Sequence, residues 1–226
     1  MKGRLVAGAA LALWIAIPCA LGAAAEKSRG VKTWSFGYQA DTLGQEPEHS
    51  AVFGGRWEVT LGSTASDSAA TDSSLAPRVL RQSETDDGID FHYLQFKKPI
   101  LEDLVASVRF RVLSGEIDPT AGLLFQLDPK GRNGYLLRVS GQKNRLIAHY
   151  LLYGKRRDIK WVDIPEVEPG VWHTLSLTRK GHMIVGSYDG VERLKIRDER
   201  YRKGNVGLWT EDDTVVEFSD LTVSNN

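Results

Sequence analysis

The chain has 226 residues, 42% of them hydrophobic, and its 29 Lys and Arg residues balance 29 Asp and Glu residues. A chain of this length forms one all-β or α/β domain, or at most two small ones. The even charge balance argues against a nucleic-acid-binding protein, which normally carries a basic excess. The content of charged residues excludes a polytopic membrane protein and argues against intrinsic disorder.

The first 25 residues have the organisation of a signal peptide. Two basic residues open the segment, an apolar run extends from Leu5 to Ile17, and small residues lead to Ala25. Because this run is too short to span a bilayer as a helix, we expect cleavage near Ala25 and no membrane span in the mature protein. The single cysteine, Cys19, lies in the same segment, so no disulfide is expected. We expect a bacterial periplasmic or secreted protein.

The rest of the chain divides into a lead-in strand and loop over residues 26–56 and a main domain over residues 57–226. The clearest strand pattern is Leu104–Val112, where five apolar side chains alternate onto one face of an extended chain. Ser107, Arg109 and Arg111 fall on the other face. This alternation predicts a strand with one buried side.

Similar apolar or alternating runs continue at hairpin spacing. They are Ala121–Leu127, Tyr135–Val139, Leu146–Tyr153, Val171–Thr178, Met183–Tyr188, Val191–Ile196, Val206–Trp209 and Val215–Val223. Asp189-Gly190, between two of these runs, is the strongest hairpin signal. Many short strands with regular turns predict an all-β fold, a single antiparallel β-sandwich jelly roll. Residues 62–77, rich in Ser and Thr, are expected to form a disordered loop.

Several segments resemble the concanavalin A-like (laminin G-like) jelly rolls, and specifically bacterial exported domains of the 3-keto-disaccharide hydrolase type. The resemblance runs in consistent order from about Trp57 to Val223. The matching stretches are Gly55–Val59, Gly115–Leu123, Asn133–Arg138, Tyr153–Arg156, Gly170–Leu175, Tyr188–Gly190, Gly204–Thr210 and Phe218–Leu221. The resemblance implies an exported domain that interacts with carbohydrate, while this fold hosts lectins, glycosidases and adhesion modules alike.

Most glycoside hydrolases use a pair of carboxylic acids as their catalytic residues. Retaining glucanases of this fold carry three acids alternating on one strand, and this chain offers only Glu116 and Asp118 before Pro119. Hydrolysis by this route requires two acids that flank the scissile bond. Glu116 and Asp118 are therefore weak catalytic candidates, and a solvated turn before the strand at Ala121 explains them equally well.

No cofactor is expected other than a structural calcium ion. Calcium prefers carboxylate and carbonyl oxygens, which Asp41 and Asp220, with Asp212 and Asp213, can supply. The idea comes from the resemblance, because jelly rolls of this kind often hold a structural ion. Solvated loop acids account for the same residues. The five histidines lack paired zinc-ligand spacing.

The charge distribution is the most informative local feature. Residues 128–160 contain nine Lys and Arg against two Asp, whereas the flanking segments are acidic. Aromatic faces and planar guanidinium donors are the groups that recognise sugars, and anionic sugars add charge-assisted hydrogen bonds. Ordinary solvent-facing arginines on a strand are the competing interpretation. The candidate ligand-binding residues are Arg138, His149, Tyr153, Arg156 and Trp161.

Three functions follow from these observations. The leading hypothesis is an exported domain that recognises an oligosaccharide or polysaccharide, neutral or anionic, and acts mainly by binding. The second is an active glycoside hydrolase on a modified (3-keto) or β-glucan substrate. The third is a laminin G-like adhesion module whose partner is a protein or an anionic polymer. No nucleic-acid partner is expected.

Overall fold

The structure is a computed structural model that describes residues 30–62, 77–85 and 91–225. The expected signal peptide and most of the expected loop at 62–77 lie outside the described residues. From Val31 onward the chain forms one compact unit. No helix among the described residues is long and apolar enough to cross a membrane.

The described residues form two antiparallel sheets and one short 3-10 helix, η1, at Tyr38–Ala40. The eight-stranded sheet has the order β13-β12-β11-β6-β15-β4-β3, with β1 paired to β15. Its strands are β1 (Thr33–Phe36), β3 (Trp57–Leu61), β4 (Arg78–Gln82), β6 (Leu104–Ser114), β11 (His173–Lys180), β12 (Met183–Tyr188), β13 (Val191–Arg197) and β15 (Val215–Ser224).

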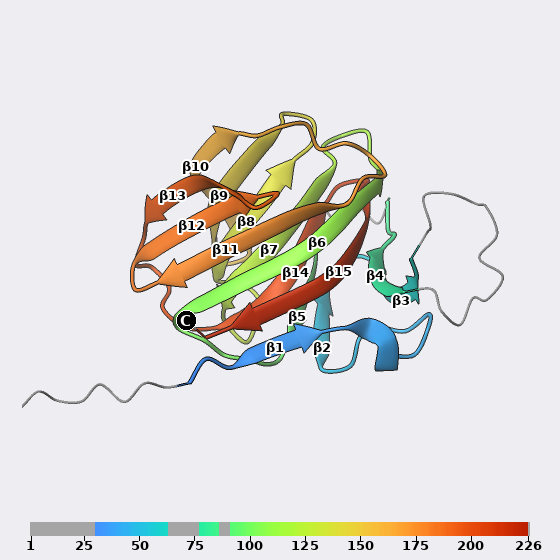
Figure 1. Cartoon of the computed structure of the whole chain (residues 1–226), viewed down its shortest axis with the longest axis horizontal. Coiled ribbons are helices and arrows are strands. Elements are labelled where there is room, and N and C mark those ends of the chain that lie inside the picture. The colour runs from blue at the N-terminus through green and yellow to red at the C-terminus, as the bar shows by residue number, and fades with distance from the viewer. Residues whose placement is uncertain (1–29, 63–76, 86–90, 226) are drawn as a thin grey trace, which may run out of the picture. The chain divides into compact units, whose positions relative to one another are not determined.

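The seven-stranded sheet has the order β10-β9-β8-β7-β14-β5-β2 and lies behind the eight-stranded sheet in Figure 1. Its strands are β2 (Ser50–Phe53), β5 (Phe91–Phe96), β7 (Thr120–Leu127), β8 (Gly134–Ser140), β9 (Arg145–Leu152), β10 (Lys155–Asp163) and β14 (Asn205–Glu211). Strands β1 and β2, from the predicted lead-in segment, thus pair with β15 and β5 of the two sheets.

The main core lies between the sheets and is built by alternation along the strands. The five apolar residues of Leu104–Val112 are each at most 1% exposed, as the sequence pattern predicts. Opposite them, Leu123 and Phe125 of β7 and Leu137 of β8 belong to the same buried cluster. The two sheets approach closely at Gly186 of β12, where a Cβ atom would lie 2.9 Å from Leu137.

The hairpin predicted at Asp189-Gly190 joins β12 to β13, with φ of 48° at Asp189 and 76° at Gly190. Two consecutive residues with positive φ are the requirement of a type I′ turn, and Asp-Gly meets it with little strain. The two antiparallel sheets, which pack against each other on the main core, confirm the predicted all-β sandwich.

Candidate functional site

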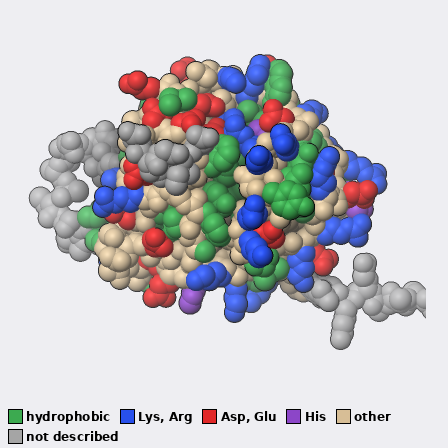
Figure 2. Space-filling model, turned by 180° about the vertical axis from the view of Figure 1, so that it is seen from behind, with side chains coloured by type: hydrophobic (Ala, Val, Ile, Leu, Met, Phe, Trp, Pro, Cys, Tyr) green, Lys and Arg blue, Asp and Glu red, His purple; other side chains and the backbone are tan. Residues whose placement is uncertain are grey.

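The face of the seven-stranded sheet that points away from the eight-stranded sheet, here called the outer face, carries the candidate site. Strand pairing aligns one residue from each of the seven strands into a row across this face. The row is Phe53, Tyr93, Trp209, Gly122, Arg138, Ile147 and Trp161. Paired residues in a sheet point to the same side, so these side chains share one surface. Figure 2 shows this side of the molecule, with hydrophobic groups beside Lys and Arg side chains.

Four aromatic residues, Phe53, Phe91, Tyr93 and Trp209, form the aromatic cluster at one end of the row. The rings of Phe53 and Tyr93 stack with centroids 5.0 Å apart, and those of Tyr93 and Trp209 lie 5.4 Å apart. Phe91 packs on Trp209 at 4.8 Å. Trp209 is 1% exposed and its indole Nε1 has no hydrogen-bond partner, while the other three rings are partly exposed. The cluster can therefore accept the apolar face of a ring-shaped ligand.

Next to the aromatic cluster lies the polar network, formed by Asp118, Arg138, His149, Arg156 and Glu211. Nη1 of Arg138 contacts Oδ2 of Asp118 at 3.0 Å and Oε1 of Glu211 at 2.7 Å. Arg156 binds the other oxygen of Glu211 and lies 5.2 Å from the centroid of the Phe91 ring. Two arginines and two carboxylates thus neutralise one another beside the exposed rings.

Burial and the two neighbouring arginines shift the pKa of Glu211 in opposite directions. Its side chain is 3% exposed, and this burial raises the pKa of the carboxyl above its ordinary value, although Arg138 and Arg156 act to lower it. The acidic neighbours Asp118 and Asp212 add to the increase. Loss of hydration favours the uncharged form of a carboxyl group, so this glutamate ionises with more difficulty than a solvated one.

The hydrogen bonds of His149 fix its protonation state. Nε of Arg138 lies 3.2 Å from Nε2 of His149, and because a guanidinium only donates, Nε2 accepts and carries no proton. The proton is then on Nδ1, which donates to Asp158 at 2.9 Å. Burial lowers the pKa of His149 to about 2, with Arg138 and Arg156 contributing in the same direction. His149 is therefore a neutral member of the network.

The two weak catalytic candidates lie in different environments. Glu116 is exposed on the loop before β7, where the main-chain N–H groups of Glu116 and Ile117 donate to the Asp213 carboxylate at 2.7 and 3.2 Å. Asp118 is a member of the polar network. The acid that the fold brings to Asp118 is Glu211, which the sequence reasoning did not select.

All four carboxylate oxygens of Asp118 and Glu211 are engaged by protein groups. Oδ1 of Asp118 accepts from Oγ of Ser140 at 2.7 Å, and Oδ2 binds Arg138. Glu211 binds one arginine through each oxygen. A nucleophile or general acid must direct an oxygen at its substrate. As the side chains lie here, the pair instead orients Arg138 and Arg156.

The five candidate ligand-binding residues divide into three groups on the outer face. Arg138, His149 and Arg156 meet in the polar network. Trp161 is 48% exposed near one end of β10, with the Arg145 guanidinium 3.6 Å from its ring centroid. Tyr153 is 70% exposed in the turn at the other end of the β9–β10 hairpin. The structure thus joins three candidates and separates Tyr153 from Trp161 by the length of that hairpin.

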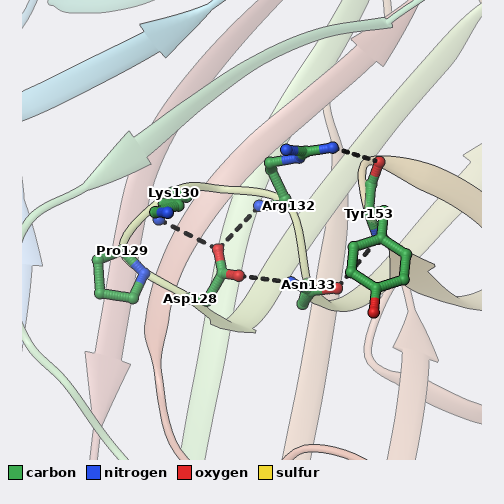
Figure 3. Close-up of a pocket in the computed structure, with 6 residues that line it drawn as sticks. All are labelled: Asp128, Pro129, Lys130, Arg132, Asn133 and Tyr153. Carbon is green, nitrogen blue, oxygen red and sulfur yellow. Dashed lines mark hydrogen bonds between the residues drawn. The ribbon is translucent and has the colours of Figure 1, made fainter.

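A pocket of about 430 Å³ lies where the β7–β8 turn meets the β9–β10 turn. We call it the turn pocket, and Figure 3 shows its lining residues. They are Asp128, Pro129, Lys130, Arg132, Asn133 and Tyr153. The main-chain N–H of Tyr153 donates to Oδ1 of Asn133 at 3.0 Å, and the N–H of Gly154 donates to the carbonyl of Arg132 at 2.7 Å.

The calcium candidates lie apart from the outer face. The carboxylate of Asp41 accepts the main-chain N–H of Glu48 at 3.1 Å, and that of Asp220 forms an exposed ion pair with Arg109 at 3.3 Å. Both carboxylates, together with burial, raise the pKa of Tyr38. Among the residues that the structure describes, no group of three or more His, Cys, Asp or Glu side chains is placed to hold a metal ion.

Several solved structures share the fold of this chain. The carbohydrate-binding module CBM66 from Bacillus subtilis matches with a TM-score of 0.64 and 14% identity, covering 78% of this chain and 96% of that chain. A Bacillus subtilis protein of unknown function with a galectin-like fold matches with a TM-score of 0.55 and 12% identity, covering 79% of this chain and 91% of that one.

The exoplasmic/lumenal domain of VIP36, in its Ca²⁺/Man-bound form, matches with a TM-score of 0.51 and 11% identity, covering 74% of this chain and 82% of that chain. No family model matches the chain, and the curated proteins give no match. The fold is a two-sheet antiparallel β-sandwich. At identities this low, the structural matches show the fold alone. They confirm the predicted fold class.

Proposed function

We propose that this protein is an exported carbohydrate-binding module whose ligand lies on the outer face of the seven-stranded sheet. The observation that carries the proposal is the contact between the aromatic cluster and the polar network. The Arg156 guanidinium lies 5.2 Å from the centroid of the Phe91 ring, so a single ligand can contact an apolar surface and a hydrogen-bond donor together. Sugars require this combination, because their rings have C–H faces and their rims have hydroxyl groups.

The fold neighbours support the same function. CBM66 is named as a carbohydrate-binding module, and VIP36 has structures with Man and Man3GlcNAc bound. The resemblance to exported 3-keto-disaccharide hydrolases remains part of the proposal and points to an oligosaccharide or polysaccharide as the partner. The residues that we propose to contact the ligand are Arg156, Tyr153 and Trp161, together with the exposed parts of the aromatic cluster. The buried Arg138 and His149 belong to the same proposed site and hold the polar network in place.

A glycan array followed by calorimetry tests the proposal. We expect binding to at least one glycan, and a loss of affinity of about tenfold or more in Phe91→Ala and in Arg156→Gln. The matched control is Trp172→Ala, because Trp172 also packs on two arginines, Arg109 and Arg111, but these belong to the eight-stranded sheet. Binding to no glycan would refute the proposal, and binding to protein alone would favour the adhesion module.

Hydrolysis is the second candidate function, and two observations favour it. Asp118 and Glu211 bind the same nitrogen, so their carboxyl groups are close together, as the pair in a retaining glycosidase must be. The raised pKa of Glu211 suits a general acid. Turnover of a 3-keto-disaccharide that is lost in Asp118→Ala and Glu211→Gln, and kept in Glu116→Ala, would establish it. Absence of turnover by the wild type would leave binding as the function.

We propose that residues 1–25 direct export and are removed near Ala25, which places the mature protein in the periplasm or outside the cell. The basic start and the short apolar run of this segment support the proposal. Mass spectrometry of the protein recovered from the periplasm of an expressing bacterium tests it. The expected mature protein begins at Glu26, and recovery of the intact chain in the membrane fraction would contradict the proposal.

We also propose a structural calcium ion near Asp41 and Asp220. Calcium prefers carboxylate oxygens, which Asp41 and Asp220 carry, and the Ca²⁺-bound structures of VIP36 support the proposal. The Arg109 ion pair opposes it weakly, because exposed ion pairs contribute little stability. Calcium is expected to raise the melting temperature of the wild type and not of Asp41→Asn. An equal melting temperature in calcium and in EGTA would refute this site.

A further inference from the structure

The turn pocket is held open by hydrogen bonds within the β7–β8 turn and between this turn and the β9–β10 turn. The Asp128 carboxylate accepts the main-chain N–H groups of Lys130 and Arg132 at 3.1 and 2.8 Å and Nδ2 of Asn133 at 2.6 Å. Asn133 in turn fixes Tyr153, and Figure 3 shows the Tyr153 ring beside Asn133. A pocket whose walls are ordered in this way costs little to organise when a ligand enters.

The pocket has two cationic side chains and one acid whose oxygens are already engaged. Burial opposes ionisation of Asp128, but the hydrogen bonds from Asn133, Arg132 and Lys130 outweigh it and lower the pKa of the carboxyl. Among the described residues, no carboxylate forms an ion pair with the side chain of Lys130 or Arg132. Arg132 uses one nitrogen, Nη2, on the carbonyl of Tyr153 at 3.4 Å. Most of its donors therefore remain available to an anion.

Tyr153 occupies a position that its side chain does not favour. Its φ is 54°, in the left-handed region, and it is followed by Gly154 at φ 79°. Asn, Asp or Gly usually fills the first of these two places, because a bulky side chain there is strained. The ring is nevertheless 70% exposed, so the core gains nothing from it. Backbone strain that buries no surface points to a role in recognition.

We propose that the turn pocket binds a uronate residue of an acidic polysaccharide. The sugar ring stacks on Tyr153, and its carboxylate is held by Arg132 and Lys130. This inference rests on the proposed function and names the class of glycan. The planar guanidinium of Arg132 can hold a carboxylate through two parallel hydrogen bonds, and Lys130 adds a second positive charge to the same pocket. The pocket volume of about 430 Å³ lies within the range of sites for small ligands.

Calorimetry with matched oligosaccharides tests the inference. The probes are trisaccharides of galacturonate, mannuronate and glucuronate, the methyl esters of the same trisaccharides, and a sulfated neutral trisaccharide. At least one uronate should bind about tenfold more tightly than its methyl ester, because the ester removes the charge. Its affinity should fall as salt is raised. Equal affinity for the acid and the ester, or stronger binding of the sulfated trisaccharide, would overturn the inference.

Two variants test the named residues. Arg132→Gln should weaken uronate binding about tenfold, with partial recovery in Arg132→Lys, whereas Arg193→Gln on the exposed face of β13 is the matched control. Tyr153→Asn should also weaken binding about tenfold while the protein keeps its melting temperature, because asparagine suits the left-handed conformation. Unchanged uronate affinity in both variants would refute the pocket as the site.

The outcomes separate the inference from the proposed function. Glycan binding that is lost in Phe91→Ala and kept in Arg132→Gln and Tyr153→Asn leaves the proposed function standing and refutes the turn pocket. Binding of neutral glycans alone does the same. Binding of no glycan refutes both.

Discussion

The carboxylates of Asp118 and Glu211 bind the same atom, Nη1 of Arg138, although Asp118 precedes β7 and Glu211 ends β14. The pairing of β7 with β14 and with β8 brings the three residues together. Arg138 therefore compensates two acids at once. Its removal leaves the partly exposed Asp118 without an arginine and the buried Glu211 with Arg156 alone, which should reduce the stability of the fold.

Arg138→Met should lower the free energy of unfolding by about 3 kcal/mol, because the buried Glu211 would lose one of its two arginine partners and Asp118 would lose its own. Urea unfolding at pH 7 measures the change. Adding Glu211→Gln to this variant should recover part of the loss, since one of the two charges is then gone. Arg193→Met, at an exposed site, is the control. A loss below 1 kcal/mol in Arg138→Met would show that the network contributes little.

Glu211 should make stability depend on pH in a direction set by its raised pKa. A carboxyl whose pKa is higher in the folded state than its ordinary 4.5 binds its proton more tightly when folded. Wild-type stability relative to Glu211→Gln should therefore fall as pH rises from about 4.5 through the folded-state pKa. Urea midpoints of both proteins at pH 4 and pH 7 test this. A relative gain at pH 7 would mean that the two arginines outweigh burial.

His149 should make stability depend on pH in the direction opposite to Glu211. Its folded-state pKa of about 2 lies below the ordinary 6.5, so the unfolded chain binds the proton as pH falls through 6.5 and the folded state loses stability. Between pH 7 and pH 5 this costs about 2 kcal/mol, which His149→Gln should remove. Urea unfolding of both proteins at the two pH values provides the measurement. The same acid-induced loss in wild type and variant would assign it to other groups.

Gly122→Ala should disturb the centre of the row on the outer face. A Cβ atom there would lie 2.8 Å from Cδ1 of Leu136 and 3.1 Å from Cβ of Trp209. We expect a loss of about 1–3 kcal/mol in unfolding free energy and a weaker glycan affinity, because Trp209 supports the aromatic cluster. Gly37→Ala is the matched control, since nothing lies within 4 Å and its φ is −95°. Equal stability of the two variants would show that Leu136 moves aside without cost.

Most of the strands could be predicted because their information is local. Alternation along Leu104–Val112 and the Asp189-Gly190 turn each depend on a few neighbouring residues, and both match the structure. Strand β10 was not among the predicted strands. Its sequence KRRDIKWVD is dominated by charges, because an edge strand buries little of either face and needs no apolar alternation.

The candidate site could be predicted only in part. Alternation along Leu146–Tyr153 separates Ala148 from His149, and the structure places Ala148 in the main core and His149 on the outer face. Nothing local indicates that Glu211 meets Arg138, since this contact requires the pairing of β14 with β7. The aromatic cluster likewise joins Phe53, Tyr93 and Trp209 from three distant segments.

The edge position of β10 gives the basic segment a second role. On this outermost strand of the sheet (Figure 1), Lys155, Arg157 and Lys160 are exposed. A bulge between Asp158 and Lys160 interrupts the hydrogen-bonding register of the strand. An edge strand with free N–H and C=O groups invites pairing with another chain, and lysines and bulges prevent that pairing. Part of the positive charge in residues 128–160 thus protects the protein from edge-to-edge aggregation.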